Sequence, residues 1–362
     1  TIETVKSNVI VNQDTEINKP VVPILQLETT VSSETIDETY KYMAFTHSGG
    51  SEDQTEYSVK FNIETECDIL IVGGGGSGGG RQGGGGGAGG IMFLQNIELS
   101  GTKTIKVGKG GVGSGSVLGT NGIDSQFDTY LAYGGSTAGG FSLVANDYNE
   151  TTNRFGSGGG ATGWFDASVE HEGWHNPNTR TNNTDLTIQG GVSHIGGRGY
   201  QDNVGSYGVQ TAYTAGGGGG AGNIGQDATP NDNTSYTGKA GNGGVGLYFG
   251  DTYGTTIGVN GWFGGGGGGS GASDIAGIGG QGGGGNGNTT TNGDNGINGS
   301  GGGGGGGGYA NRFGGNGGSG IVIIRYKVAD ATMEPQTLTH YTPERMYPPT
   351  RDLASASHLI SG

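Results

Sequence analysis

The stretch that decides the fold is residues 68–94, which read DILIVGGGGSGGGRQGGGGGAGGIMFL. An aliphatic segment leads directly into two glycine runs, and an apolar segment follows them. Glycine runs have no side chains to bury, so their backbone N–H and C=O groups must be satisfied by other backbone groups. We therefore expect backbone hydrogen bonds, rather than an ordinary apolar core, to hold most of this chain together.

The same composition extends through the chain, and it separates three possible states. Glycine accounts for 89 of 362 residues, against a usual share of roughly 7%. Collagen is excluded because it needs glycine at every third residue and abundant proline, whereas this chain has 8 prolines and unbroken glycine runs. A flexible linker is disfavoured because strand-like segments border the runs, at residues 68–72, 103–107 and 320–326.

The remaining state is a bundle of extended polyglycine II helices, which have three residues per turn, a rise of about 3.1 Å and no internal hydrogen bonds. Glycine runs that suit it lie near residues 73–80, 83–90, 108–115, 134–140, 156–163, 190–199, 215–222, 241–246, 264–271, 277–287, 301–308 and 314–320. We expect a slab of packed antiparallel rods, clamped by short β-strands, with almost no α-helix. The fold class is thus irregular and mainly β.

Between the runs lie segments of mixed composition, which we expect to be long surface loops. They are residues 141–155, 164–189, 200–213, 223–239, 247–263 and 288–298. Uniform rods that hold chemically distinct loops suit a protein that presents those loops to a partner.

Several motifs, in a fixed order, resemble those of a known family. They are YMAFTHSGG, EYSVKFNIETECDILIVGGGGSGGG, the VGKGG step, the NGIDSQF step and the closing GGSGIVIIRYK. Together they resemble the glycine-rich domain of fibre and adhesin proteins of phages and, most closely, of large DNA viruses. The resemblance implies packed polyglycine II helices at a virion surface, with loops at one end that serve host recognition in the phage members.

The resemblance covers residues 40–327, which we expect to form the glycine-rich domain. Residues 1–39 are polar with short β-prone segments, and we expect an extended arm that contacts other virion proteins or another copy; a disordered tail is the alternative. Residues 328–362 are expected to be a proline-containing linker toward a C-terminal part of a longer product. A homo-oligomer, with a trimer as the first candidate, is expected for a protein of this type.

Charge and apolar content exclude several partners. The net charge is −15 with only 17 basic residues and no basic cluster, so nucleic acid binding is not expected. No apolar stretch reaches 18 residues, so membrane insertion is not expected. The single cysteine, Cys67, lies in a strand-like segment and is expected to be a small buried hydrophobe.

Two motifs match known cofactor or metal sites, but the residues around them do not suit the structure that each site needs. The glycines at 73, 75 and 78 satisfy GxGxxG, but no helix follows, and no glycine run precedes Lys-Ser or Lys-Thr. His171-Glu-Gly-Trp-His175 matches HExxH, but Gly173 and Pro177 oppose the helix that would align both imidazoles on a metal. We expect no catalytic residues, no cofactor and no metal.

The remaining candidates are aromatic and histidine residues in the expected loops. As receptor contacts the sequence nominates Trp164, Phe165, His171, Trp174, His175, Tyr253 and Trp262. Exposed rings would stack on sugar rings; the competing interpretation is that the aromatics are lids over the rod ends. The pair Trp262-Phe263, directly before a glycine run, favours a lid, whereas Trp174 and His175, far from any run, favour exposure.

Two functions therefore remain open. The first is a non-enzymatic virion surface fibre or adhesin that attaches to a host-surface glycan or protein through its loops. The second is a structural spacer or capsid decoration protein without receptor binding.

Overall fold

A computed structural model gives the conformation of most of the glycine-rich region. It describes residues 25–27, 32–35, 39–115, 118–140, 156–161, 184–187, 191–197, 199–202, 212–230, 238–271, 275–309 and 311–327. All of them belong to one compact unit, Val21–Ala329. The described part is mainly β, as the sequence predicts, and its helical content is one short helix, α1 (Gly250–Tyr253).

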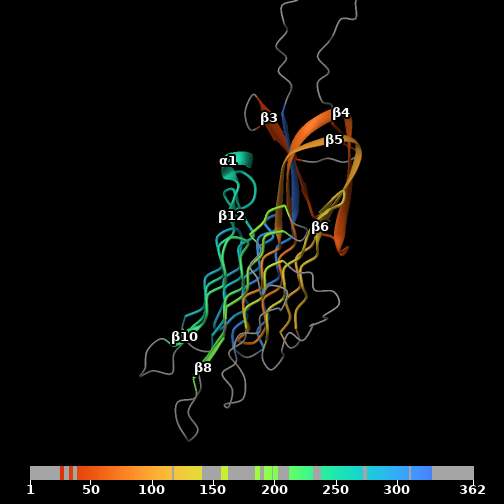
Figure 1. The fold of residues 1–362 in the computed structure, drawn as a ribbon. Coiled ribbons are helices and arrows are strands. Elements are labelled where there is room, and N and C mark those ends of the chain that lie inside the picture. The colour runs from red at the N-terminus through yellow and green to blue at the C-terminus, as the bar shows by residue number, and fades with distance from the viewer. Residues whose placement is uncertain are drawn as a thin grey trace, which may run out of the picture. The chain divides into compact units, whose positions relative to one another are not determined.

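An antiparallel sheet occupies one end of this unit (Figure 1). Its strand order is β2-β3-β14-β4-β5-β6-β7, and β1 pairs with β4. The strands are β1 (Leu25–Leu27), β2 (Ser32–Thr35), β3 (Tyr40–Thr46), β4 (Gln54–Val72), β5 (Ile91–Gly108), β6 (Ser125–Phe127), β7 (Tyr130–Ala132) and β14 (Ile321–Lys327). β14 lies between β3 and β4, which fastens the end of the glycine-rich region to its beginning.

The strands expected at 68–72, 103–107 and 320–326 are confirmed within β4, β5 and β14, although β14 begins one residue later. β4 is buried on both faces near its end, because Ile69 and Ile71 belong to one apolar cluster and Leu70 to another. A strand covered on both faces needs apolar residues at successive positions, which explains the uninterrupted apolar run from Ile69 to Val72. Cys67 is confirmed as a buried hydrophobe, and burial, with the nearby Asp68 and Glu66 carboxylates, raises the pKa of its thiol to about 12.

The glycine runs leave this sheet as extended segments, which we call rods. In the rod 73–79, successive N–H groups bond to different neighbouring rods, and every third one bonds to the same neighbour. The bonds are Gly75 to Gly318 and Gly78 to Gly315, Gly76 to Gly87 and Gly79 to Gly84, and Gly74 to Ile123 and Ser77 to Thr120. This period is the one expected of a polyglycine II helix with three residues per turn.

Interior rods approach each other too closely for side chains. A Cβ placed on Gly87 would lie 1.9 Å from the carbonyl oxygen of Ser157, and one on Gly75 would lie 2.1 Å from that of Gly302. Both obstacles are backbone atoms of neighbouring rods, which cannot turn aside as a side chain would. Glycine is thus required at these positions by close approach.

Rod direction differs from the expected antiparallel arrangement. Rods joined by a tight turn are antiparallel, as 73–79 and 84–90 are. Gly85 and Ala88, however, donate to Gly216 and Gly219, which makes these two rods parallel. A polyglycine II helix bonds sideways in several directions, so only neighbours joined directly by a turn must be antiparallel.

Some expected loops are also rods. Residues 223–228 and 291–298 bond to neighbouring rods at three-residue intervals, and the expected run 277–287 is divided by a turn at residues 281–283. Non-glycine residues fit in these rods because they lie at the margin of the slab, where Ile224 and Asn295 are exposed. The expectation that 223–239 and 288–298 are loops throughout is therefore wrong.

Within the segment expected to form an N-terminal arm, the structure describes β1 and β2 and Thr39. These two strands pair with β4 and β3 of the protein's own sheet. The remaining residues of 1–39 and all of 328–362 lie outside the described residues. Contact of the arm with other proteins stays a prediction.

Candidate functional site

Trp164, Phe165, His171, Trp174 and His175 all lie outside the described residues. Tyr253 is described, and its nomination is wrong, because its side chain is 0% exposed. Trp262 is half-buried, and its ring centroid lies 5.2 Å from that of the exposed Tyr248.

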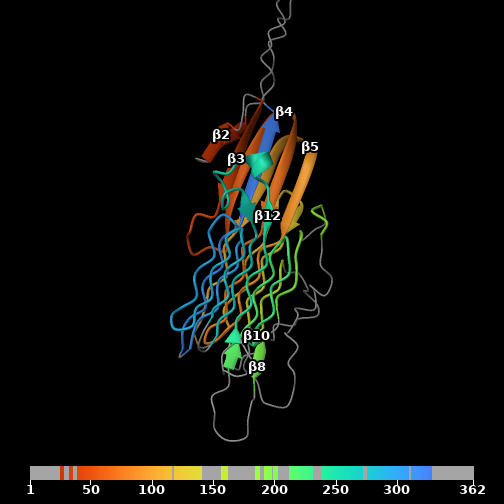
Figure 2. The same cartoon turned by 90° about the vertical axis from the view of Figure 1, so that its left-hand side faces the viewer.

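The segment that contains Tyr253 is a lid on the sheet rather than a contact loop. It comprises β12 (Leu247–Tyr248), α1 and β13 (Trp262–Phe263), and Figure 2 shows α1 and β12 in front of the sheet. Phe249 packs edge-on against Phe93 of β5, with ring centroids 5.2 Å apart. Tyr253 and Phe263 belong to the same apolar cluster as Leu70, so their rings are buried as the lid interpretation expects, but against the sheet rather than over the rod ends.

At the end of the rods away from the sheet, short paired strands act as loop stems (Figure 1). β8 (Tyr200–Asp202) pairs with β9 (Ala212–Thr214), and β10 (Thr229–Pro230) pairs with β11 (Gly238–Lys239). Isolated bridges join Thr214 to Gly271 and Lys239 to Ile275. The described residues that flank segments 203–211, 231–237 and 272–274 are therefore held beside one another by backbone pairing.

A second candidate lies along the side of the slab, where asparagines line an open groove. We call it the asparagine groove: its floor is the rod 313–319, and the rods 291–298 and 109–113 flank it. Two hollows of about 640 and 220 Å³ share Asn295 and Asn316 in their linings, so they are neighbours along the groove.

The groove asparagines bind backbone donors at regular intervals. The side-chain oxygens of Asn292, Asn295 and Asn298 accept hydrogen bonds from the N–H groups of residues 313, 316 and 319, at 3.0, 2.8 and 3.0 Å. Asn316 in turn accepts one from Gly113 at 2.8 Å. These bonds satisfy backbone donors that face the open side of the slab, and they hold three rods in register.

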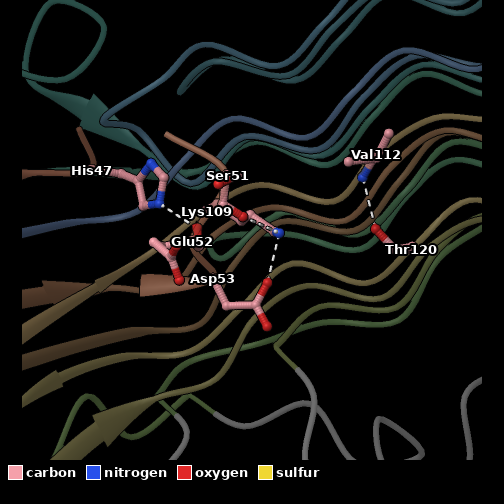
Figure 3. Close-up of polar contacts among 7 residues, drawn as sticks. All are labelled: His47, Ser51, Glu52, Asp53, Lys109, Val112 and Thr120. Atoms are coloured by element: carbon pink, nitrogen blue, oxygen red, sulfur yellow. Dashed lines mark hydrogen bonds and ion pairs between the residues drawn. The ribbon is translucent and has the colours of Figure 1, made fainter. Parts of the chain in front are cut away.

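Residues of the loop between β3 and β4 line the smaller hollow, and Figure 3 shows the polar contacts that hold this loop. Lys109 forms an ion pair with Asp53 at 2.6 Å and also donates to the carbonyl of Ser51. His47 is held by two bonds: its Nε2 donates to the carbonyl of Glu52 at 3.0 Å, and its Nδ1 accepts from the N–H of Gly49. The loop is thereby attached to the first residues of the rod 109–113.

The opposite end of the groove carries an exposed aromatic ring. Phe313 is 53% exposed and lines the larger hollow together with Arg312 and Asp294. Its N–H bonds to the Asn292 side chain, and its carbonyl accepts from Gly293 at 3.0 Å. Both backbone groups of Phe313 are therefore bonded to the rod 291–298, which positions the ring at this end of the groove.

Sequence reasoning missed this groove, although a signal was present. Residues 292–300 read NGDNGINGS, with asparagine and glycine repeating every third residue. In a helix with three residues per turn this repeat places all three asparagines on one side. Single glycines do not form a glycine run, so the sequence alone predicts a loop for this segment.

His194, the third imidazole near the HExxH match, lies inside the rod bundle. It is 7% exposed, and its Nδ1 donates to the carbonyl of Gly220 at 3.1 Å. Burial lowers the pKa of this imidazole, against the opposing effect of its backbone bonds.

Within the described residues no group of three or more His, Cys, Asp or Glu side chains is arranged to hold a metal ion. The described residues also include no helix long and apolar enough to cross a membrane.

Comparison with protein families agrees with this architecture. The model of the glycine-rich domain family matches residues 51–327. The chain therefore belongs to this family of glycine-rich domains. A search of curated proteins finds no match to it.

Proposed function

We propose that this protein is a non-enzymatic virion surface fibre or adhesin that presents loops for attachment to a host-surface glycan or protein. The observation that carries the proposal is the set of neighbouring loop stems at one end of the rods. Rods that are hydrogen-bonded to neighbours on several sides form a stiff support. Loops on a rigid support lose less conformational freedom on binding, which favours affinity.

The sequence motifs support the viral setting, since they resemble fibre and adhesin domains of phages and large DNA viruses. In this proposal residues 1–39 contact other virion proteins, the protein is a homo-oligomer with a trimer as the first candidate, and it acts outside the cell. Trp164 and Trp174 are the proposed sugar-stacking residues, because exposed aromatic rings suit the faces of sugars. Nucleic acid is not a proposed partner, because the net charge is −15.

The second candidate function is a structural spacer or capsid decoration protein without a receptor. The burial of Tyr253 favours it, because an aromatic residue nominated for contact proves to support the sheet. In this case the rods supply stiffness, and the loops only connect them.

A glycan array separates the two candidates. The full chain is compared with the double variant Trp164→Ala/Trp174→Ala and with Trp262→Ala, an aromatic change on the lid. Selective binding that is lost in the double variant and kept in Trp262→Ala supports attachment through the loops. A well-folded chain that binds neither glycans nor host cells would leave the spacer as the function.

A further inference from the structure

The asparagine groove has the chemistry of a binding site that is separate from the loop stems. We propose that it binds a chain of neutral sugars laid along the rod 313–319. The proposal goes beyond the attachment function above, because it uses the side of the slab and none of the loop residues. Its support comes from the donors, spacing, aromatic ring and charge of the groove.

The first support is a row of oriented amide donors. Asn292, Asn295, Asn298 and Asn316 are all exposed, and each uses its side-chain oxygen to accept a backbone N–H. Because an N–H donor must face the carbonyl, the orientation of each amide is determined and its NH₂ group is turned away from that bond. Among the described residues these four NH₂ groups have no hydrogen-bond partner.

The second support is the spacing of these donors. Asn292, Asn295 and Asn298 recur every third residue, which is roughly 9 Å along a polyglycine II helix. The backbone bonds hold the row in register, so little freedom is lost when a ligand binds. A repeating row of fixed donors suits a repeating ligand that carries acceptors along its length, as a chain of sugar hydroxyls does.

The third support is the exposed ring at one end. Phe313 is held through its backbone by the rod 291–298, and a Cβ on Gly115 would meet its ring at 3.0 Å, so the ring lies against that rod end. A positioned ring that is 53% exposed can serve as a platform for the apolar face of a sugar. The ring suits the apolar face of a sugar, and the amide donors beside it suit the sugar's hydroxyl groups.

Charge favours a neutral ligand over an anionic one. Lys109 is paired with Asp53 at 2.6 Å. Arg312 and Asp294 line the same hollow, so their opposite charges leave little net field for a polyanion. The groove therefore presents hydrogen bonds and an aromatic ring rather than a basic surface.

A rod from a second copy is the competing occupant, and the hydrogen bonds argue against it. A docking rod would need free backbone donors on the groove floor. The N–H groups of residues 313, 316 and 319 already bond to asparagine side chains. The asparagines thus occupy the positions that another rod would use.

The test uses variants that keep the backbone hydrogen bonds of the groove and change only the side-chain groups that would contact a sugar. Asn295→Asp/Asn316→Asp retains an oxygen for each backbone N–H but replaces the outward NH₂ donor with an acceptor. Phe313→Ala removes the ring. Asn242→Asp is the matched control, because Asn242 accepts from Ile278 at 2.8 Å in the same way, with the rods 264–271 and 301–308 between it and the groove floor. Circular dichroism and thermal unfolding confirm folding of each variant.

The probes are an array of neutral oligosaccharides, heparin as the anionic comparison, and sedimentation of the chain without ligand. We expect neutral oligosaccharides to bind the wild type and Asn242→Asp, and to bind the two groove variants about tenfold more weakly or worse. The proposal is overturned by equal binding in the groove variants, by binding of heparin alone, by no binding of neutral sugars, or by self-association that only the groove variants lose.

The loop variant distinguishes this site from the proposed attachment function. If Trp164→Ala/Trp174→Ala abolishes sugar binding while the groove variants retain it, the groove proposal fails and loop attachment stands. If only the groove variants lose it, the groove stands and sugar recognition by the loops fails.

Discussion

The sheet and the rods are stabilised by two different interactions. In the sheet, side chains such as Ile71 and Ile323 are completely buried, so apolar area removed from water supplies the stability. In the rods, Gly75 and Gly87 bring backbone against backbone, and hydrogen bonds to neighbouring rods replace the apolar core. The comparison teaches that the two regions should fail differently: the sheet through lost volume, the rods through added volume.

The largest effect is expected from one added methyl group inside a rod. Gly87→Ala would place Cβ 1.9 Å from the Ser157 carbonyl oxygen, so backbone must move on both rods. We expect a loss of more than about 4 kcal/mol of folding free energy, a large part of the roughly 5–15 kcal/mol that stabilises an ordinary domain. Soluble expression and thermal unfolding measure it.

The matched control is Ala88→Gly, one residue further along the same rod. It removes a methyl group and should cost about 1 kcal/mol through backbone entropy. A Gly87→Ala protein that unfolds at the wild-type temperature would contradict the close rod packing.

A truncation in the sheet should have the next largest effect. Ile323→Ala removes a fully buried side chain between β3 and β4 and is expected to cost about 2–5 kcal/mol, while Ile323→Val should cost about 0.5–1.5 kcal/mol. Urea unfolding compares the two variants. If Ile323→Val proves as damaging as Gly87→Ala, the distinction between the two regions does not hold.

A smaller effect is expected at the margin of the slab, where rods meet water. Asn295→Ala removes the acceptor of the Asn316 N–H, and we expect a loss of about 0.5–1.5 kcal/mol because the bond is exposed. Asn295→Asp keeps the acceptor and should remain near wild-type stability at neutral pH. Chemical unfolding of the three proteins tests this, and equal stability of all three would show that the asparagine bond contributes nothing.

The smallest effect is a pH dependence that arises inside the rods. Burial lowers the pKa of His194 below its ordinary value of 6.5, so the unfolded chain takes up this proton at higher pH than the folded one. Its contribution to stability is complete above about pH 6.5 and declines as the pH falls toward the folded pKa. Unfolding of the wild type and His194→Gln between pH 7.5 and 5.5 should show a steeper decline for the wild type; parallel curves would refute the assignment.

Part of the fold could be predicted from the sequence because local composition specifies it. The DILIV and IVII segments can only be buried strands in this context, and the long glycine runs exclude both collagen and an apolar core. The sequence does not decide the role of Tyr253, because an aromatic residue between glycine runs serves equally well as a lid or as a contact. The asparagine groove was missed because single glycines at every third residue form a rod as well as an unbroken run does.

The sequence by itself determined that this protein has strands that clamp polyglycine rods, since residues without side chains can be satisfied only by other backbone. Only the tertiary structure decided which rods are neighbours, which run parallel, and that Asn292, Asn295 and Asn298 share one groove with Phe313. The reason is that glycines are identical to one another, so a run carries no information about its partner. Neighbours are selected collectively, by the positions of the strands, the turns and the few side chains that the close packing admits.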